Sequence, residues 1–224
     1  MSHHLSASTE DYLKVIYGLT LEQERASTNE IAGKMGVTAA SATGMIQKLA
    51  AADPALVDYQ KHRGVCLTAE GRQAALEIIR HHRLLETFLH EKLGYGWEKV
   101  HAEADRLEHV ISEELEEHIS QALGDPAYDP HGDPIPTREL QVPHRSSIRM
   151  SELRQGEWAT VQRISDANPD LLSYLSSIGL KPNSQVTILE ASPFDGNLQI
   201  QVCGQDTPSV LGLRVTSQIF VTPG

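Results

Sequence analysis

The sequence has few cysteines, no long apolar run and little positive charge, and each shortage excludes a class of protein. Cys66 and Cys203 are far apart and form no Cys-x-x-Cys pair, which fits a reducing cytoplasm and not a disulfide framework. No apolar run approaches the roughly 20 residues that a membrane-spanning helix needs. The opening stretch MSHHLSASTEDY lacks the apolar core of a secretory signal. We therefore expect a cytoplasmic protein that has no membrane partner.

The shortage of positive charge is concentrated in one part of the chain. The whole sequence has 19 Lys and Arg against 30 Asp and Glu, a net charge of −11. Residues 76–140 hold 6 of the basic and 15 of the acidic residues, together with 7 of the 11 histidines. Residues 1–75 and 141–224 each carry a net charge of only −1. Because binding depends on local charge, the acidic total does not exclude contact with nucleic acid elsewhere.

The N-terminal pattern is typical of a helix–turn–helix followed by a β-hairpin. Apolar side chains recur at helical spacing in STEDYLKVIYGL, where Ser8 or Thr9 is the expected N-cap. The stretch STNEIAGKMGVTAASATGMIQKLAA predicts two helices joined by a short turn at Gly36. Two β-prone runs then flank a basic tip, KHRG. This order predicts a winged helix-turn-helix domain over residues 1–73.

The second helix of such a unit lies in the major groove of double-stranded DNA, with its N-terminal residues at base edges. Basic residues on the hairpin tip would neutralise phosphates. Gly44 inside the helix costs about 1 kcal/mol relative to alanine, which indicates close packing or close approach of DNA. The alternative is a three-helix packing unit with an exposed loop. The predicted DNA-binding residues are Thr38, Ala40, Ser41, Thr43, Lys48, Lys61 and Arg63.

The remaining chain predicts a helical domain, a linker and a small β domain. Over residues 74–140 we expect a long helix, a short helix around WEKV, and one uninterrupted acidic helix, HAEADRLEHVISEELEEHIS, which the Pro- and Gly-rich stretch LGDPAYDPHGDPIP ends. A linker follows at 141–150. Residues 151–224 alternate like short strands around one helix, DLLSYLSSIG, and predict an SH3-like β-barrel. The expected fold class is mainly α with small β.

Imidazoles and carboxylates gather on two of the expected helices. Four of them would fall within an arc of about 100° on the acidic helix, beside its apolar face. Two more form an i, i+4 pair on the earlier helix. Each pair alone is more often a surface hydrogen bond, but two packed helices would bring these ligands together. Without a thiolate, the set favours Mn²⁺ or Fe²⁺ over a sulfur-rich zinc site. The six residues are His82, Glu86, His101, Asp105, Glu108 and His109.

Several stretches resemble the diphtheria toxin repressor family of metal-dependent transcriptional regulators, including its manganese transport regulator branch. They include STEDYLKVIY, VTAASATGMIQKL, RGVCLTAEGR, RHHRLLETFL, KVHAEADRLEHVIS and DPHGDPIP. The pattern His-x-x-x-Glu, then His-x-x-x-Asp-x-x-Glu-His, is highly specific. The C-terminal part is similar to the family's SH3-like (FeoA-type) domain in its position in the chain and in its pattern of short alternating strands. The resemblance implies a metal-activated repressor of metal-uptake genes that binds a palindromic operator as a homodimer.

The resemblance also implies residue roles. Asp11 would join Asp105, Glu108 and His109 at a main metal site, and the carboxylates at 11 and 105 are similar to the manganese branch. That branch has another carboxylate one turn after Asp11, where this chain has Lys14, so we expect one metal at the main site. An acid from the SH3-like domain, Asp170 or Asp166, would complete an ancillary site. The other implied ancillary ligands are His82, Glu86, His101, Asp129 and His131.

Two other functions fit parts of the sequence. A winged-helix regulator that senses an organic ligand would use the acidic helices only for dimerisation, and its DNA binding would not depend on metal. A carboxylate-bridged dimetal enzyme would exploit the Glu-x-x-His spacing of Glu98 and His101. Such an enzyme needs four long helices with inward ligands, and it leaves the recognition helix and the basic wing unexplained. We therefore expect a regulator and not an enzyme.

Overall fold

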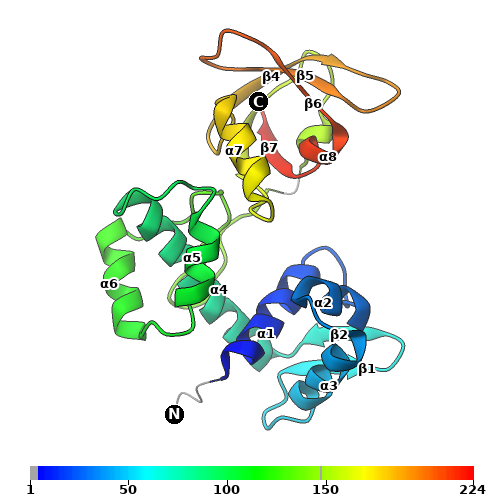
Figure 1. The fold of residues 1–224 in the computed structure, drawn as a ribbon, viewed down its shortest axis with the longest axis vertical. Coiled ribbons are helices and arrows are strands. Elements are labelled where there is room, and N and C mark those ends of the chain that lie inside the picture. The colour runs from blue at the N-terminus through cyan, green and yellow to red at the C-terminus, as the bar shows by residue number, and fades with distance from the viewer. Residues whose placement is uncertain (1–4, 147) are drawn as a thin grey trace. The chain divides into compact units, whose positions relative to one another are not determined.

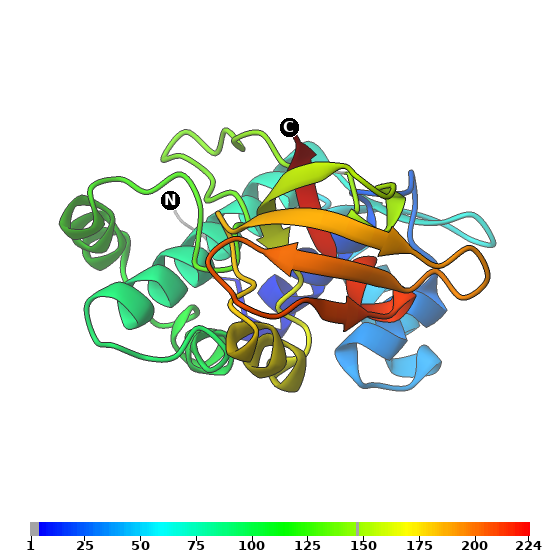
Figure 2. The same cartoon turned by 90° about the horizontal axis from the view of Figure 1, so that it is seen from above.

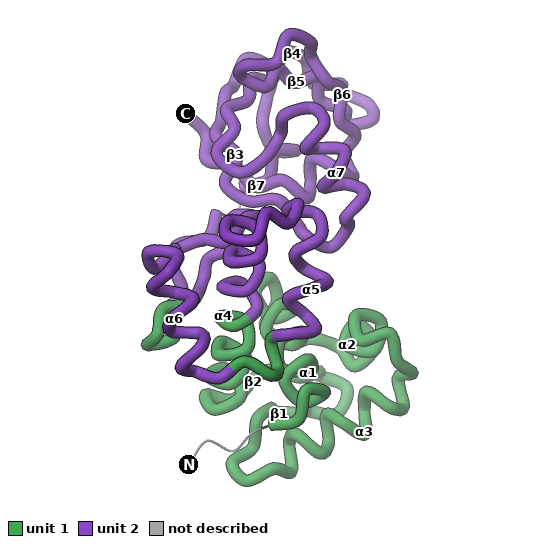
Figure 3. The backbone as a smooth tube through the Cα atoms, turned by 60° about the vertical axis from the view of Figure 1, so that its left-hand side comes forward, with its two compact units in different colours: residues 1–81, 108–111, 136–141 green, residues 82–107, 112–135, 142–224 purple. Residues whose placement is uncertain are grey.

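The computed structural model describes residues 5–146 and 148–224. The chain divides into two compact units, which Figure 3 colours green and purple. The first unit comprises residues up to 81 together with 108–111 and 136–141. The second unit comprises residues 82–107, 112–135 and 142–224. None of the helices in the described ranges has the length and apolar character needed to cross a membrane.

The first unit is the predicted winged helix-turn-helix (Figure 1). It contains α1 (Ala7–Leu19), α2 (Thr28–Met35), α3 (Ala39–Ala50), the antiparallel pair β1 (Val57–Gln60) and β2 (Gly64–Leu67), and the start of α4 (Ala69–Glu91). Ser27 and Glu30 form a capping box at the start of α2, and Gly36 ends that helix in the left-handed conformation with φ 65°. Leu13, Ile16 and Ile46 are fully buried in its core.

The N-cap of α1 lies earlier than the sequence predicted. Ser6, and not Ser8 or Thr9, caps the helix, because its side chain accepts a hydrogen bond from the backbone N–H of Thr9. Thr9 is buried, and its hydroxyl lies 2.9 Å from the hydroxyl of Ser6. The helix therefore begins at Ala7, which places Glu10 and Asp11 within its first turns.

The helical part of the second unit differs from the prediction in two places. Residues 97–99 form a turn, where a separate short helix was expected, and this turn leads into α5 (Val100–Leu107). The expected uninterrupted helix over 101–120 is wrong, because α5 ends at Leu107 and α6 (Glu113–Leu123) is a separate helix. Ser112 caps α6 by accepting from the backbone N–H of Leu115, and the β-branched residues just before it are weak helix formers.

The β part of the second unit is one antiparallel sheet with strand order β6-β5-β4-β3-β7. Its strands are β3 (Trp158–Ile164), β4 (Gln185–Ala191), β5 (Leu198–Val202), β6 (Ser209–Leu211) and β7 (Ile219–Pro223). Figure 2 shows them, coloured from yellow-green to red, curling around a shared interior. Apolar side chains at alternate positions fill that interior, as β5 shows. The predicted helix is α7 (Pro169–Ser177), and the structure adds α8 (Leu213–Thr216) and a 3₁₀ turn, η1 (Met150–Glu152).

The Pro- and Gly-rich loop over residues 129–134 lies against strand β3 within the second unit. The backbone carbonyl of His131 accepts a hydrogen bond from the N–H of Ile164 at 2.9 Å. Gly132 has φ 86°, and a Cβ atom there would lie 1.9 Å from the carbonyl oxygen of Gln162. Only glycine fits both the conformation and the space. This close approach fixes the position of His131, whose ring stacks on Trp97.

Candidate metal centres and nucleic-acid interface

A buried group of imidazoles and carboxylates surrounds Glu86 in the second unit; we call it the Glu86 cluster. Its residues come from α4, α5, the 129–134 loop and the segment after β3. Oε1 of Glu86 lies 2.9 Å from Nε2 of His82 and 3.0 Å from Nδ1 of His101. The same His101 nitrogen lies 3.2 Å from Oδ2 of Asp166. The members of the cluster are His82, Glu86, His101, Asp129, His131 and Asp166.

The deepest part of the Glu86 cluster contains two polar atoms that have no hydrogen-bond partner among the described residues. These are Oε2 of Glu86 and Nδ1 of His131, which lie 3.6 Å apart in side chains that are fully buried. Nε2 of His131 lies 2.8 Å from the backbone carbonyl of Trp97. Because a carbonyl can only accept, Nε2 carries a proton and Nδ1 faces the carboxylate. Buried polar atoms without partners are costly, so this geometry fits a site that binds a cation.

The charges of the Glu86 cluster are strongly coupled. Burial raises the pKa of Glu86, but the positive charge of His82 and the hydrogen bonds of neighbouring histidines outweigh it and hold that pKa well below its usual range. Burial lowers the pKa of His101, whereas hydrogen bonds to Asp166 and Glu86 raise it to about 11. Burial also lowers the pKa of His131, whereas the adjacent carboxylate of Glu86 and the negative charges of Asp129 and Asp166 raise it to about 9. Protons therefore occupy both histidines at neutral pH when no metal is bound.

Asp129 organises the loop that carries His131. Its Oδ1 accepts hydrogen bonds from the backbone N–H groups of His131 and Asp133, at 2.8 and 2.9 Å. Burial and the negative charges of Glu86 and Asp133 raise the pKa of Asp129 well above its usual value. A carboxyl group in this environment is stabilised as an anion only when a cation is nearby, which Arg83, 3.6 Å from Oδ2, partly provides.

The acid that the SH3-like domain supplies to the Glu86 cluster is Asp166, and not Asp170. Burial raises the pKa of Asp166, but the hydrogen bond from His101 lowers it to about 2, so the side chain is ionised. Asp170 lies four residues later, in the exposed first turn of α7, where its backbone N–H donates to the side chain of Asn168. Among the described residues, Asp166 and not Asp170 is grouped with His82, Glu86 and His101.

A second group lies in the first unit, where the turn of Glu108 and His109 meets α1; we call it the His109 cluster. Nε2 of His109 lies 3.1 Å from Oδ1 of Asp11 and 3.5 Å from Oε1 of Glu108. The group offers only nitrogen and oxygen ligands, as the sequence predicted. Lys14 places its ammonium 2.6 Å from Oε1 of Glu108, which is almost fully buried. That positive charge lies one helical turn after Asp11, on the same helix.

Glu10 belongs to the His109 cluster, although the sequence pattern did not single it out. Its Oε2 lies 2.7 Å from Nδ1 of His109, on the side of the ring opposite Asp11. His81 supports the same turn, because its Nδ1 lies 3.1 Å from the backbone carbonyl of Glu108. The signal for Glu10 was its position next to Asp11, but its partner depends on a contact 99 residues away in sequence.

Asp105 lies beside two histidines within the second unit. Its carboxylate oxygens lie 3.4 Å from Nδ1 of His82 and 3.5 Å from Nε2 of His101. The helix that was expected to carry Asp105 together with Glu108 and His109 ends at Leu107, and the latter two residues form the turn that follows.

The predicted DNA-facing residues lie at the start of α3 and at the wing tip. The side chain of Thr38 caps α3 by accepting from the N–H of Ser41. Thr43 is half-buried, and its hydroxyl donates to the backbone carbonyl of Ala39, so it is engaged within the helix. A Cβ atom added to Gly44 would meet nothing within 4 Å, so close packing within the chain does not explain this glycine. The exposed members are Thr38, Ala40, Ser41, Lys48, Lys61 and Arg63.

Arg25 holds the base of the wing and was not predicted. Its guanidinium donates to Oδ2 of Asp58 at 2.9 Å and to the backbone carbonyl of Asp58 at 2.6 Å. It also donates to the carbonyl of Gly64 at 3.3 Å, so it bridges β1 and β2. The wing tip at Lys61 and Arg63 therefore projects from a hairpin that is fixed at its base.

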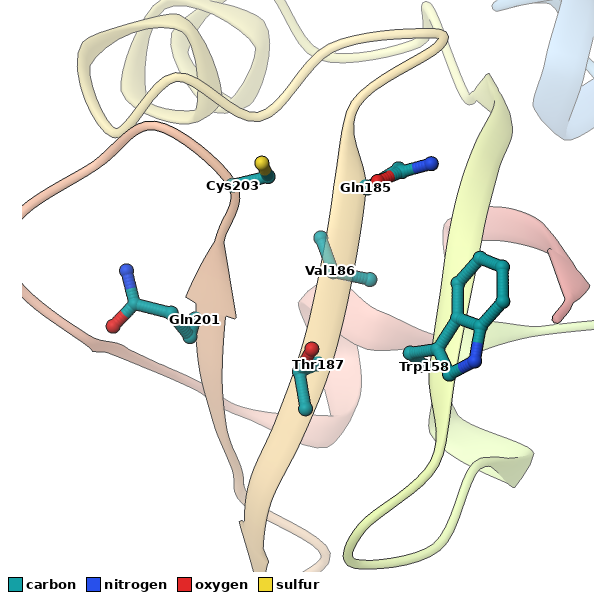
Figure 4. A pocket seen from close by; sticks show the side chains of 6 residues that line it. All are labelled: Trp158, Gln185, Val186, Thr187, Gln201 and Cys203. Carbon is teal, nitrogen blue, oxygen red and sulfur yellow. The ribbon is translucent and has the colours of Figure 1, made fainter.

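The SH3-like sheet also has a hollow of about 260 Å³ on its surface, shown in Figure 4. Its lining residues are Trp158, Gln185, Val186, Thr187, Gln201 and Cys203. None of these side chains is a carboxylate or an imidazole, so the hollow is not a candidate site for Mn²⁺ or Fe²⁺.

Profiles of known protein families match almost the entire chain. Residues 4–65 match the iron dependent repressor N-terminal DNA binding domain, and residues 68–137 match the iron dependent repressor metal binding and dimerisation domain. Residues 148–223 match the FeoA domain. The three matches follow the order that the sequence predicted.

Individual relatives agree with these matches. The iron-dependent repressor IdeR of Mycobacterium leprae is 31% identical over 212 residues, covering 89% of this chain and 90% of that protein. The diphtheria toxin repressor of Corynebacterium jeikeium is 30% identical and covers 81% of this chain and 85% of that protein. Among solved structures, a manganese-dependent transcriptional repressor in complex with manganese has 42% identity and a TM-score of 0.89, covering 96% of this chain and 100% of that one. The manganese regulator SloR has 32% identity and a TM-score of 0.79, covering 96% and 98%. The chain therefore belongs to the iron-dependent, or diphtheria toxin, repressor family of metal-dependent transcriptional repressors.

Proposed function

We propose that this chain is a repressor of metal-uptake genes that Mn²⁺ or Fe²⁺ activates. The observation that carries the proposal is the buried pair of unpartnered atoms, Oε2 of Glu86 and Nδ1 of His131, inside a cluster of nitrogen and oxygen ligands. The solved relative with 42% identity is named as manganese-dependent, whereas the IdeR relatives are named as iron-dependent. Ligand chemistry alone admits both ions, since supply in the cell often decides between them.

Two one-metal sites are part of the proposal. The first uses Asp11, Glu108 and His109, and the second is the Glu86 cluster with Asp166 as the acid from the SH3-like domain. Asp105 is a proposed ligand beside His82 and His101. A bound divalent ion would add positive charge at these carboxylates. The Glu86 cluster exchanges the protons of His101 and His131 for that charge.

The His109 cluster couples metal binding to DNA binding. Asp11 belongs to α1 of the winged helix, whereas Glu108 and His109 belong to the turn between α5 and α6. When these side chains share one cation, they hold α1 and the turn together and restrict the DNA-reading unit. Metal then favours the DNA-competent state through differential affinity, and DNA favours metal binding in return. A coupling of about 1–3 kcal/mol changes affinity about 5–150-fold.

The proposed partner is double-stranded DNA with a palindromic operator, bound by a cytoplasmic homodimer. Two-fold related recognition helices require two half-sites, which fits the family's dimerisation domain. We propose the domain boundaries 1–73 for the winged helix, 74–140 for the metal-binding and dimerisation domain, 141–150 for the linker and 151–224 for the SH3-like domain. The DNA contacts proposed are those of the α3 start and the wing tip.

The test is a titration of chelator-treated protein with Mn²⁺, and with Fe²⁺ without oxygen. The readout is binding to DNA from its own promoter region and from nearby metal-transporter promoters. Binding that appears only with metal supports the proposal, and the two midpoints rank the ions. Binding that is indifferent to metal and to chelator overturns it and returns the clusters to a structural role.

A further inference from the structure

We propose that Glu10 is a positioning residue that fixes the ring tautomer of His109, so that Nε2 is the metal-binding atom. This inference rests on the proposed function, because it concerns the His109 cluster as a metal site. Nothing in the sequence pattern assigned a role to Glu10. The chemical class of ligand is a divalent metal cation held by imidazole nitrogen and carboxylate oxygen.

Glu10 and Asp11 hold the two nitrogens of one imidazole ring. Oε2 of Glu10 lies 2.7 Å from Nδ1 of His109, and Oδ1 of Asp11 lies 3.1 Å from Nε2. Successive residues on a helix differ in direction by about 100°, so two neighbours on α1 can reach opposite sides of a ring that stands against the helix. The side chain of His109 is 15% exposed and that of Glu10 is 22% exposed, so water competes only partly for these contacts.

An imidazole that binds metal through one nitrogen is neutral and keeps a single N–H, for which these two carboxylates compete. An ionised carboxylate can only accept, so whichever one receives the proton also decides which nitrogen keeps a lone pair. The shorter contact to Glu10 places the proton on Nδ1. Nε2 then presents its lone pair beside Asp11 and also beside Oε1 of Glu108, 3.5 Å away. Three potential ligand atoms thus converge on one point, with the proton held on the far side of the ring.

Without Glu10, Asp11 would be the remaining carboxylate acceptor of the ring. The N–H would move to Nε2, and the nitrogen nearest Asp11 and Glu108 could no longer bind metal without first changing tautomer. A purely structural Glu10–His109 contact predicts something different, namely a less stable junction between α1 and the turn with no change in tautomer. The tautomer is therefore the property that separates the two roles.

The experiment compares the full-length protein with Glu10→Ala and Glu10→Gln, and uses Glu24→Ala as the control. Glu24 is an exposed glutamate in the segment that follows α1, so its loss removes the same charge outside the cluster. Each protein is labelled with ¹⁵N-histidine and titrated with Zn²⁺, which is diamagnetic. Long-range ¹H–¹⁵N spectra report which ring nitrogen carries the proton and give a midpoint for each histidine. A His109→Gln spectrum assigns the signals of His109.

We expect His109 of the wild type to carry its proton on Nδ1 and to bind Zn²⁺ through Nε2. Glu10→Ala should move the proton toward Nε2. It should also raise the Zn²⁺ concentration at which His109 is half-saturated by about 10–100-fold, the usual cost of losing such a supporting carboxylate. Glu10→Gln should also move the proton toward Nε2, because a neutral amide accepts the N–H less strongly than the carboxylate of Asp11 does and can itself donate to Nδ1. Glu24→Ala should match the wild type.

Zinc bound through Nδ1 in the wild type, or an unchanged midpoint and tautomer in Glu10→Ala, would overturn the role of Glu10 and leave the metal site intact. A wild-type His109 that does not respond to Zn²⁺ at all would overturn this inference together with the proposed site. Should Glu10→Ala fail to fold, Glu10→Gln still decides the matter, because a proton that stays on Nδ1 in that variant contradicts the proposal.

Discussion

The ammonium of Lys14 lies 2.6 Å from Oε1 of Glu108, inside the group that Asp11 and His109 complete. Glu108 is only 1% exposed, whereas the side chain of Lys14 is 23% exposed, so water reaches this pair only from the lysine side. The positive charge of Lys14 already balances one carboxylate of the proposed metal site. A metal ion must therefore share Glu108 with Lys14 or displace the lysine. Because position 14 is a lysine, it supplies no further carboxylate for a two-metal cluster.

Lys14→Met should tighten Mn²⁺ binding at the His109 cluster. Removing a cation close to a divalent ion lowers the repulsion by several kcal/mol even at an effective dielectric constant of about 20, and about 1.4 kcal/mol corresponds to tenfold in affinity. We expect a gain of at least about tenfold, measured by calorimetric titration, with the metal stoichiometry unchanged. Weaker binding would show instead that Lys14 orients Glu108 as a ligand. Lys34→Met, on α2, provides the matched control.

Asp105→Ala and His109→Ala should each abolish metal-stimulated DNA binding without unfolding the protein. Each variant removes a proposed ligand but no buried apolar side chain. Gel shifts with and without Mn²⁺ measure the response, and circular dichroism checks the fold. Glu113→Ala, which removes an exposed carboxylate from the first turn of α6, should behave like the wild type. A normal metal response in both ligand variants would contradict the assignment of the sites.

In an experiment at about pH 7.5, metal binding at the Glu86 cluster should release protons to the solvent. The raised pKa values of His101, about 11, and of His131, about 9, mean that both rings are protonated before metal binds. Because a ligating nitrogen must lose its proton, metal affinity should rise with pH until these groups have titrated. Calorimetry in buffers of different ionisation enthalpy counts the protons released. His131→Gln should lower that count by about one, and a heat that is independent of the buffer would contradict the assignment.

Arg63→Ala should weaken DNA binding equally for different sequences. The wing tip is exposed and basic, which suits contact with phosphates and not with base edges. Loss of one phosphate contact should reduce the slope of log affinity against log salt by about 1. Arg154→Ala, an exposed arginine of the SH3-like domain, should leave the slope unchanged. An unchanged slope for Arg63→Ala would remove the wing tip from the interface.

The sequence predicted the features that short-range signals specify. Ser27, Glu30 and Gly36 mark the ends of α2 by local hydrogen bonding, and the structure confirms those ends. The break after Leu107 was missed, because the polar pattern continues into Glu108 and His109 while their partners, Lys14 and Glu10, lie on α1. The choice between Asp166 and Asp170 likewise depends on the position at which β3 ends. Neither composition nor residue spacing predicts that position.

Gly132→Ala should disrupt the Glu86 cluster from outside its set of ligands. An alanine Cβ there would lie 1.9 Å from the carbonyl of Gln162, so the loop would have to move away from β3 and carry His131 with it. Gly204→Ala is a matched control, because Gly204 has a similar φ of 83° but no atom within 4 Å of the added carbon.

Both variants should lose about 1–3 kcal/mol of unfolding free energy from backbone strain. Only Gly132→Ala should also weaken Mn²⁺ binding at the Glu86 cluster, because only there does the added methyl group displace a loop that carries a ligand. Thermal unfolding without metal measures the shared strain, and metal titration measures the difference. Equal metal affinity in the two variants would show that the packing of the loop on β3 does not position His131 for metal binding.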